Sequence, residues 1–233
     1  DAAAVNIRGK FGDTPLIEAS IRQTIASIYM YLGYYDKAEE HIKRVRDIYL
    51  KEFSEQNLQT SDSFYNLGVL YSLMNRFDEA IPLLKKSLEF RYQKDPHVLN
   101  VKCMLAINYQ MLARNEEAEL LFEEVRNNID NIELIQNVSD ARILQVMSLL
   151  AFGYGSQGNY QTAKDLLNRI IEISSKLGIE ENHSVQMVKS KLVTLLSSCP
   201  DDQIRDGKRA VELATNLCDQ TNWINYNYID ILA

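Results

Sequence analysis

The stretch LGVLYSLMNRFDEAIPLLKKS, Leu67 to Ser87, has a layout that recurs three more times along the chain. It joins an aliphatic residue, a small residue and a tyrosine to a turn residue and then to an alanine. The other copies are IASIYMYLGYYDKAEEHIKRV (25–45), LAINYQMLARNEEAELLFEEV (105–125) and LAFGYGSQGNYQTAKDLLNRI (150–170). Tyrosine occupies only 13 of the 233 positions, so four aligned tyrosines indicate a true internal repeat.

The aligned positions predict a helical hairpin. The small residue and the tyrosine follow the aliphatic residue by one and four positions, so all three share one helix face. After the turn, the alanine and most residues four and seven positions later are apolar, and only Ser87 breaks this stripe. The aligned residues are Ala26, Gly68, Ala106 and Ala151 (small), Tyr29, Tyr71, Tyr109 and Tyr154, and Ala38, Ala80, Ala118 and Ala163. One hairpin cannot cover its own apolar face, so the sequence predicts an all-α fold, a right-handed solenoid with a concave and a convex side.

The repeat predicts five hairpins and part of a sixth. We expect a lead-in helix and the start of the first hairpin in residues 1–24, where Pro15 is a helix-start signal, and the solenoid in residues 25–233. The fifth hairpin is weaker, because CPDDQIRDGKRA makes a longer turn, and Leu232-Ala233 resembles the opening of another unit within a longer protein. The expected units are 20–53, 62–92, 100–130, 143–178, 185–220 and, in part, 225–233.

Composition argues against several classes of protein. A net charge of -7 and a pI near 5.1 disfavour a nucleic-acid surface, and the basic run from His41 to Arg46 is expected to be a solvated helix face. No apolar run is long enough to span a membrane, and the N-terminus lacks a signal-peptide layout. Three scattered cysteines predict neither a disulfide framework nor a zinc site, and they leave the compartment open.

The layout resembles the tetratricopeptide repeat, and its long period resembles the kinesin-light-chain-like subtype. Asp95-Pro-His97-Val98 and Asn182-His183-Ser-Val185 look like that subtype's entry into a new repeat. The similarity covers about residues 16–233. A finer resemblance, in residues 1–41 and 199–233, is to the C-terminal repeat regions of planctomycete-type bacterial transmembrane serine/threonine kinases, which would make this chain an interaction or sensing region. The kinase signatures themselves do not occur in the sequence.

The segment GYGSQG, Gly153 to Gly158, matches a pattern used by phosphate-binding loops. A phosphate loop must follow a strand and open a helix, or bridge two strands, whereas these glycines close a predicted helix. His41, His97 and His183 fall in separate hairpins, and Cys103 is expected on a helix surface or in the groove. The sequence therefore predicts no catalytic constellation, cofactor or metal.

The concave surface is the expected binding site. First-helix residues opposite the buried stripe would form an apolar strip edged by amides and hydroxyls, suited to an extended peptide or a helix with apolar anchors. The alternative is that these side chains pack on the repeat's own second helices. No Lys or Arg is expected in the groove, which disfavours a clamp for C-terminal carboxylates. The predicted groove residues are Gln23, Tyr65, Val69, Ile107, Gln110, Met111 and Phe152.

These features predict a non-catalytic module that binds a protein or peptide, without nucleic-acid binding or direct membrane contact. Two alternatives remain open at this stage. One is a regulatory region of a kinase, and the other is a self-association module that stacks through the C-terminal repeat. The sequence does not identify the partner.

Overall fold

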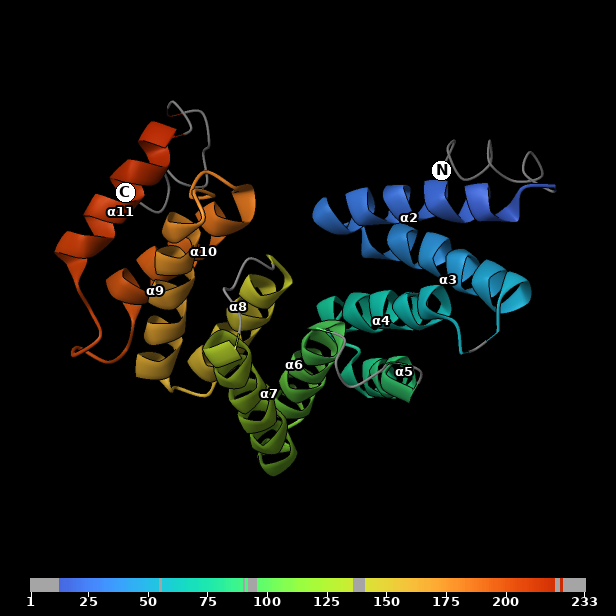
Figure 1. The fold of residues 1–233 in the computed structure, drawn as a ribbon, viewed down its shortest axis with the longest axis horizontal. Helices are drawn as coiled ribbons and strands as arrows, with labels where there is room; N and C mark the ends of the chain where they lie inside the picture. Colours follow the sequence, from blue (N-terminus) through green and yellow to red (C-terminus); the bar gives the residue numbers. More distant parts are fainter. Residues whose placement is uncertain are drawn as a thin grey trace. The chain divides into compact units, whose positions relative to one another are not determined.

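The computed structural model describes residues 13–54, 56–89, 91, 96–135, 141–220 and 223, and this part of the chain contains ten helices and no strand. Contacts pair eight of these helices into four antiparallel hairpins, and a tight turn at residues 112–114 joins the other two in the order predicted for the third hairpin (Figure 1). The expected partial unit at 225–233 and the first part of the lead-in segment lie outside the described residues. The helices are α2 (Pro15–Tyr31), α3 (Tyr35–Glu52), α4 (Leu58–Leu73), α5 (Phe77–Glu89), α6 (Pro96–Met111), α7 (Asn115–Ile135), α8 (Ala141–Ser156), α9 (Tyr160–Lys176), α10 (His183–Ser198) and α11 (Gly207–Gln220).

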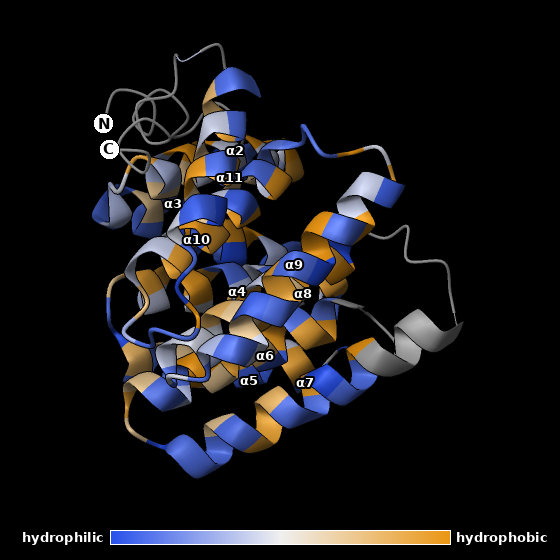
Figure 2. Cartoon of the chain, turned by 90° about the vertical axis from the view of Figure 1, so that its left-hand side faces the viewer, coloured by the Kyte–Doolittle hydropathy of each residue, from blue (hydrophilic) through white to orange (hydrophobic). Residues whose placement is uncertain are grey.

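The chain divides into two compact units, residues 1–121 and 122–233, and each is described by itself. The boundary falls within α7, the second helix of the third hairpin. Unit 1 contains the first two hairpins and α6, and unit 2 contains the last two hairpins. Figure 2 shows apolar and polar residues alternating around helices such as α7 and α9, as expected for helices with one buried face.

Each of the first four hairpins turns through the same backbone motif. The turn residues Gly33, Asn75, Ala113 and Gly158 have φ values of 76°, 60°, 58° and 82°. In every case the next residue donates its N–H to the carbonyl of the aligned tyrosine, at 2.8 or 2.9 Å. This is the hydrogen bond of a Schellman motif, so the turn residue predicted from the alignment is the one that ends the helix.

The aligned residues form the core. All four small residues, all four alanines after the turn, and three of the four tyrosines are buried, while Tyr29 is partly exposed. Ser87, the exception in the apolar stripe, is also fully buried. Its hydroxyl lies 3.2 Å from the Ser61 hydroxyl, so the polar side chain is tolerated there because it has a hydrogen-bond partner.

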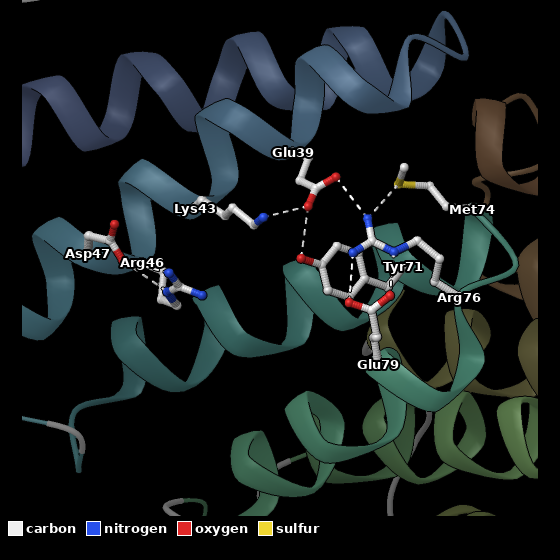
Figure 3. Close-up of polar contacts among 8 residues, drawn as sticks. All are labelled: Glu39, Lys43, Arg46, Asp47, Tyr71, Met74, Arg76 and Glu79. Atoms are coloured by element: carbon white, nitrogen blue, oxygen red, sulfur yellow. Dashed lines mark hydrogen bonds and ion pairs between the residues drawn. The ribbon is translucent and has the colours of Figure 1, made fainter.

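The first and second hairpins are joined by a polar cluster between α3, α4 and the turn before α5 (Figure 3). One oxygen of Glu39 accepts a hydrogen bond from the Tyr71 hydroxyl at 2.9 Å, and the other pairs with Arg76 at 3.0 Å. The Arg76 guanidinium lies 4.0 Å from the centre of the Tyr71 ring and also pairs with Glu79 at 2.7 Å. Arg114 lies over the ring of Tyr109 in the same way, 4.4 Å from its centre. Tyr71 and Tyr109 therefore each also hold an arginine of the following turn.

The prediction of a solvated face for residues 41–46 is wrong for part of this run. His41 is only 1% exposed, and its Nδ1 atom lies 3.3 Å from Nη1 of the buried Arg22. The buried carboxylate of Glu18 accepts hydrogen bonds from Arg22 Nε at 2.8 Å and from Arg44 Nε at 3.0 Å. We call these four residues the α2–α3 ionic cluster. Arg22 and His41 are buried because they occupy stripe positions beside Ala26 and Ala38.

The α2–α3 ionic cluster predicts a pH-dependent stability of the first hairpin. An arginine only donates, so His41 Nδ1 must accept and the ring must be neutral. Burial and, next, the charge of Arg22 lower the pKa of His41 below its ordinary value of 6.5. Because the pKa of His41 is lower in the folded chain than in the unfolded chain, the neutral ring favours folding. This contribution to the free energy of unfolding is fully present above the unfolded-state pKa of about 6.5 and is lost as the pH falls below it. We expect the urea midpoint of the wild-type chain to fall between pH 7.5 and 5.5, with little of this fall in His41→Asn.

The control for this prediction is His183→Asn, because His183 is exposed at the start of α10. That variant should retain the wild-type fall in stability. Hydrogen bonding from Arg44, together with Arg22, lowers the pKa of Glu18 below 4.5, so the carboxylate stays ionised throughout the tested range. An unchanged pH profile in His41→Asn would contradict the assignment.

Candidate functional site

Unit 2 contains a furrow between its two first helices, α8 and α10, with α9 packed against both of them. The furrow has two halves, of about 500 and 510 Å³, and we call the whole the α8–α10 furrow. Its first half is lined by Phe152, Gly155, Ser156, Ala163, Leu167, Lys191, Thr194 and Leu195, among others. Its second half is lined by Arg142, Gln145, Ser148, Leu149, Ile170, Met187, Val188 and Lys191, among others.

Phe152 is the exposed aromatic side chain of the first half. It is 53% exposed, whereas its neighbours Ala151 and Gly153 are buried. Gly155 lies one turn further along α8, and a Cβ atom there would meet only the Cβ of Ala163, at 3.7 Å. The absent side chain thus leaves room for a ligand beside Phe152. Exposed aromatic residues next to a recess are typical anchors of binding surfaces.

Lys191 is a cation of the furrow that the sequence pattern, which predicts no Lys or Arg in the groove, does not indicate. It lines both halves of the furrow, and its ammonium group donates a hydrogen bond to Ser148 Oγ at 3.1 Å. The side chain remains accessible to solvent, yet the protein atoms around the ammonium lower the pKa of Lys191. The expectation of a groove without cations is therefore corrected, because Lys191 reaches into the furrow from a flank of α10.

Unit 1 has a smaller recess between α2 and α4. It has a volume of about 250 Å³, and the apolar side chains of Ala26, Ile42 and Val45 are among its lining. Gln23, Ser27, Ser63 and Asn66 add polar groups to the same lining. Gln23, a predicted groove residue, is exposed here and lies 3.5 Å from the Tyr49 hydroxyl.

The other predicted groove residues of unit 1 differ in exposure. Met111 is 52% exposed, Val69 and Gln110 are half-buried, and Ile107 is buried. The buried side-chain oxygen of Gln110 accepts no hydrogen bond from the described residues. Tyr65 packs its ring edge against His97, with the ring centres 4.5 Å apart, and burial raises the pKa of Tyr65 to about 12. Tyr65 and Ile107 therefore present less surface to a ligand than Met111 does.

The glycines of GYGSQG do not form a phosphate loop in this structure. Gly153 and Gly155 lie inside α8, and Gly158 is the turn residue that follows it. The helix interior offers no free backbone N–H groups, because each is bonded within the helix. Gly153 has a packing role instead, since a Cβ atom there would lie 2.3 Å from the ring of Phe122.

The described part of the chain contains no group of side chains that could hold a metal ion. No three His, Cys, Asp or Glu side chains there could hold one ion. Cys103 is fully buried, so its predicted place on a helix surface or in the groove is wrong, and burial raises its pKa. None of the described helices has the length and apolar character that crossing a bilayer requires.

Comparison with known proteins agrees with this architecture. Residues 17–93 match the tetratricopeptide repeat family model. The fold is similar to the nearly identical TPR-like repeats of a putative kinesin light chain from Podospora anserina, with a TM-score of 0.56 and 21% identity over 87% of this chain and 94% of that one. It is also similar to BtubC (BKLC) from P. vanneervenii, with a TM-score of 0.63 and 18% identity over 94% and 88% of the two chains.

A third similar structure is the apo form of the quorum sensor NprR from B. thuringiensis, with a TM-score of 0.60 and 14% identity over 94% of this chain and 58% of that one. A search of curated proteins finds no match. At these identities the likeness shows the fold alone. The chain thus has a TPR-like repeat fold, and such repeats generally serve as non-catalytic modules of protein interaction.

Proposed function

We propose that this chain binds a peptide or protein segment through its first-helix surfaces, and that the α8–α10 furrow is the main contact in unit 2. The observation that carries the proposal is Phe152, a half-exposed aromatic side chain above an open furrow of largely apolar lining. A monomeric protein gains nothing by exposing such a residue to water, whereas an apolar anchor of a ligand would cover it.

Unit 1 supplies a second contact in this proposal. Met111 and Gln23 are its exposed members, and Gln110 lies half-buried next to Met111. Val69, Tyr65 and Ile107 would contribute as the partly covered floor beside them. Each unit contacts the ligand through its own first helices.

The test is a selection of binding peptides from a random displayed library on the wild-type chain, followed by affinity measurements on variants. Phe152→Ala should weaken the selected peptides by about tenfold or more, because truncating a central aromatic anchor typically costs 1–2 kcal/mol. Val211→Ala is the matched control, since Val211 is 55% exposed on the second helix α11. Equal affinities of all three proteins for every selected peptide would contradict the proposal.

The two alternative functions from the sequence remain predictions. A role as the regulatory region of a bacterial serine/threonine kinase rests on the resemblance in residues 1–41 and 199–233, and the parent reading frame tests it. Self-association through the C-terminal repeat predicts a concentration-dependent increase in mass by light scattering that persists when the chain is extended past Ala233. Loss of the increase on extension would contradict this alternative.

A further inference from the structure

The α8–α10 furrow has its positive charge at its centre. The hydrogen bond from Lys191 to Ser148 runs from α10 to α8 and separates the two halves. Apolar side chains lie on both sides, with Phe152 and Leu195 in the first half and Met187 and Leu149 in the second. A ligand lying along the furrow would therefore meet apolar surface, then an ammonium group, then apolar surface again.

No described residue neutralises this ammonium group. Its hydrogen-bond partner is a neutral hydroxyl, and neither Asp nor Glu is among the described residues that line the furrow. The lowered pKa of Lys191 reflects the same surroundings, because crowding by protein atoms weakens the hydration of the charge. A ligand carboxylate beside this ammonium group would form a charge-assisted hydrogen bond, which is stronger than the hydrogen bonds that the ammonium group makes with water.

A second cation, Arg142, lines the second half of the furrow near the start of α8. Six helical residues separate it from Ser148, a distance of about 9 Å along the axis. It lies too far from Lys191 to share one carboxylate. Lys191 is therefore the cation that lies next to the apolar side chains of both halves.

The spacing of the two halves defines the spacing of the ligand. Their centres are about eight residues apart along α8 and also along α10, which corresponds to ~12 Å. An extended chain rises about 3.3 Å per residue, so residues i and i+4 are ~13 Å apart. Residues i, i+2 and i+4 of an extended chain also point to the same side, so the middle one would face Lys191.

We infer that the α8–α10 furrow selects an extended segment in which an acidic residue stands between two apolar residues, in the order apolar, any, acidic, any, apolar. This inference rests on the proposed function and specifies the ligand of the same site. The apolar side chains occupy the two halves, and the acidic side chain pairs with Lys191 in place of Ser148. Gln145 and Thr194 add one polar side chain to the lining of each half.

The experiment uses capped synthetic peptides, Gly-Phe-Ser-Glu-Ser-Phe-Gly and its versions with Gln or Lys in place of Glu, titrated calorimetrically into the full chain. The Glu peptide should bind wild type about tenfold more tightly than the Gln peptide. Lys191→Gln should abolish that difference, and Lys191→Glu should reverse the preference in favour of the Lys peptide. Lys208→Gln, an exposed lysine at the start of α11, makes the same charge change outside the furrow and should leave the preference intact.

Other outcomes separate this inference from the proposed function. Binding of all three peptides with equal affinity, weakened by Phe152→Ala but not by Lys191→Gln, would overturn the charge selection and leave the peptide site standing. Failure of every selected and synthetic peptide to bind would overturn both. A peptide in which Phe, Glu and Phe are each four residues apart places the three side chains on one face of a helix. If it bound more tightly than Gly-Phe-Ser-Glu-Ser-Phe-Gly, the ligand would be helical and the proposed two-residue spacing would be refuted.

Discussion

Gly153→Ala is expected to lower the free energy of unfolding by about 2 kcal/mol, whereas Gly155→Ala in the same helix should leave it unchanged or raise it by up to about 1 kcal/mol. A Cβ atom at Gly153 would lie 2.3 Å from the ring of the fully buried Phe122. The ring cannot withdraw, because it also contacts Tyr154, with ring centres 5.6 Å apart. At Gly155 the nearest atom is 3.7 Å away, so the alanine gains helix propensity without a clash.

Urea denaturation followed by circular dichroism measures both values. Gly68→Ala is a useful intermediate case, because a Cβ atom there would lie 2.8 Å from the branched end of Leu84, which can adjust more readily than a ring. If Gly153→Ala and Gly155→Ala had equal stability, the close approach of α8 to Phe122 would be refuted. The matched pair also removes helix propensity as an explanation, since both changes are Gly to Ala within α8.

These glycines show how far the sequence predicts the fold. The alignment of Gly68 with Ala26, Ala106 and Ala151 indicates a close helix contact, because any larger residue there would break a repeating pattern. Gly153 and Gly155 carry no such signal: they are two of three glycines in one motif, and only the residues opposite them, Phe122 and Ala163, give one a tight contact and the other free space. That information depends on which side chains meet between helices.

The candidate site was predictable in part for the same reason. Helical register predicts that Phe152 and Met111 lie opposite the buried stripe, and both are about half exposed. Register does not predict that Tyr65 turns its ring against His97, or that Lys191 reaches Ser148 across 43 positions of sequence. A long side chain at the edge of a helix face can lie over either face, so its position depends on neighbours from another hairpin.

Glu18→Gln is expected to destabilise the chain by about 3 kcal/mol, because it removes the carboxylate of the α2–α3 ionic cluster. The side chain of Arg22 is only 3% exposed, so its charge would remain buried without a counter-charge. Arg44 differs, since its side chain is 51% exposed and can turn into water. Most of the loss therefore arises at Arg22, and urea denaturation at pH 7.5 measures it.

Two further variants decide whether the cause is the unpaired charge. In Glu18→Leu/Arg22→Met the ion pair is replaced by apolar residues of similar volume, and most of the lost stability should return, because desolvation of the pair offsets much of its attraction. Glu172→Gln breaks the pair with Lys176, in which both side chains are mostly exposed, and should cause no measurable change. If the double variant were as unstable as Glu18→Gln, the loss of stability would come from poorer packing between α2 and α3. The unpaired buried charge of Arg22 would then not be its cause.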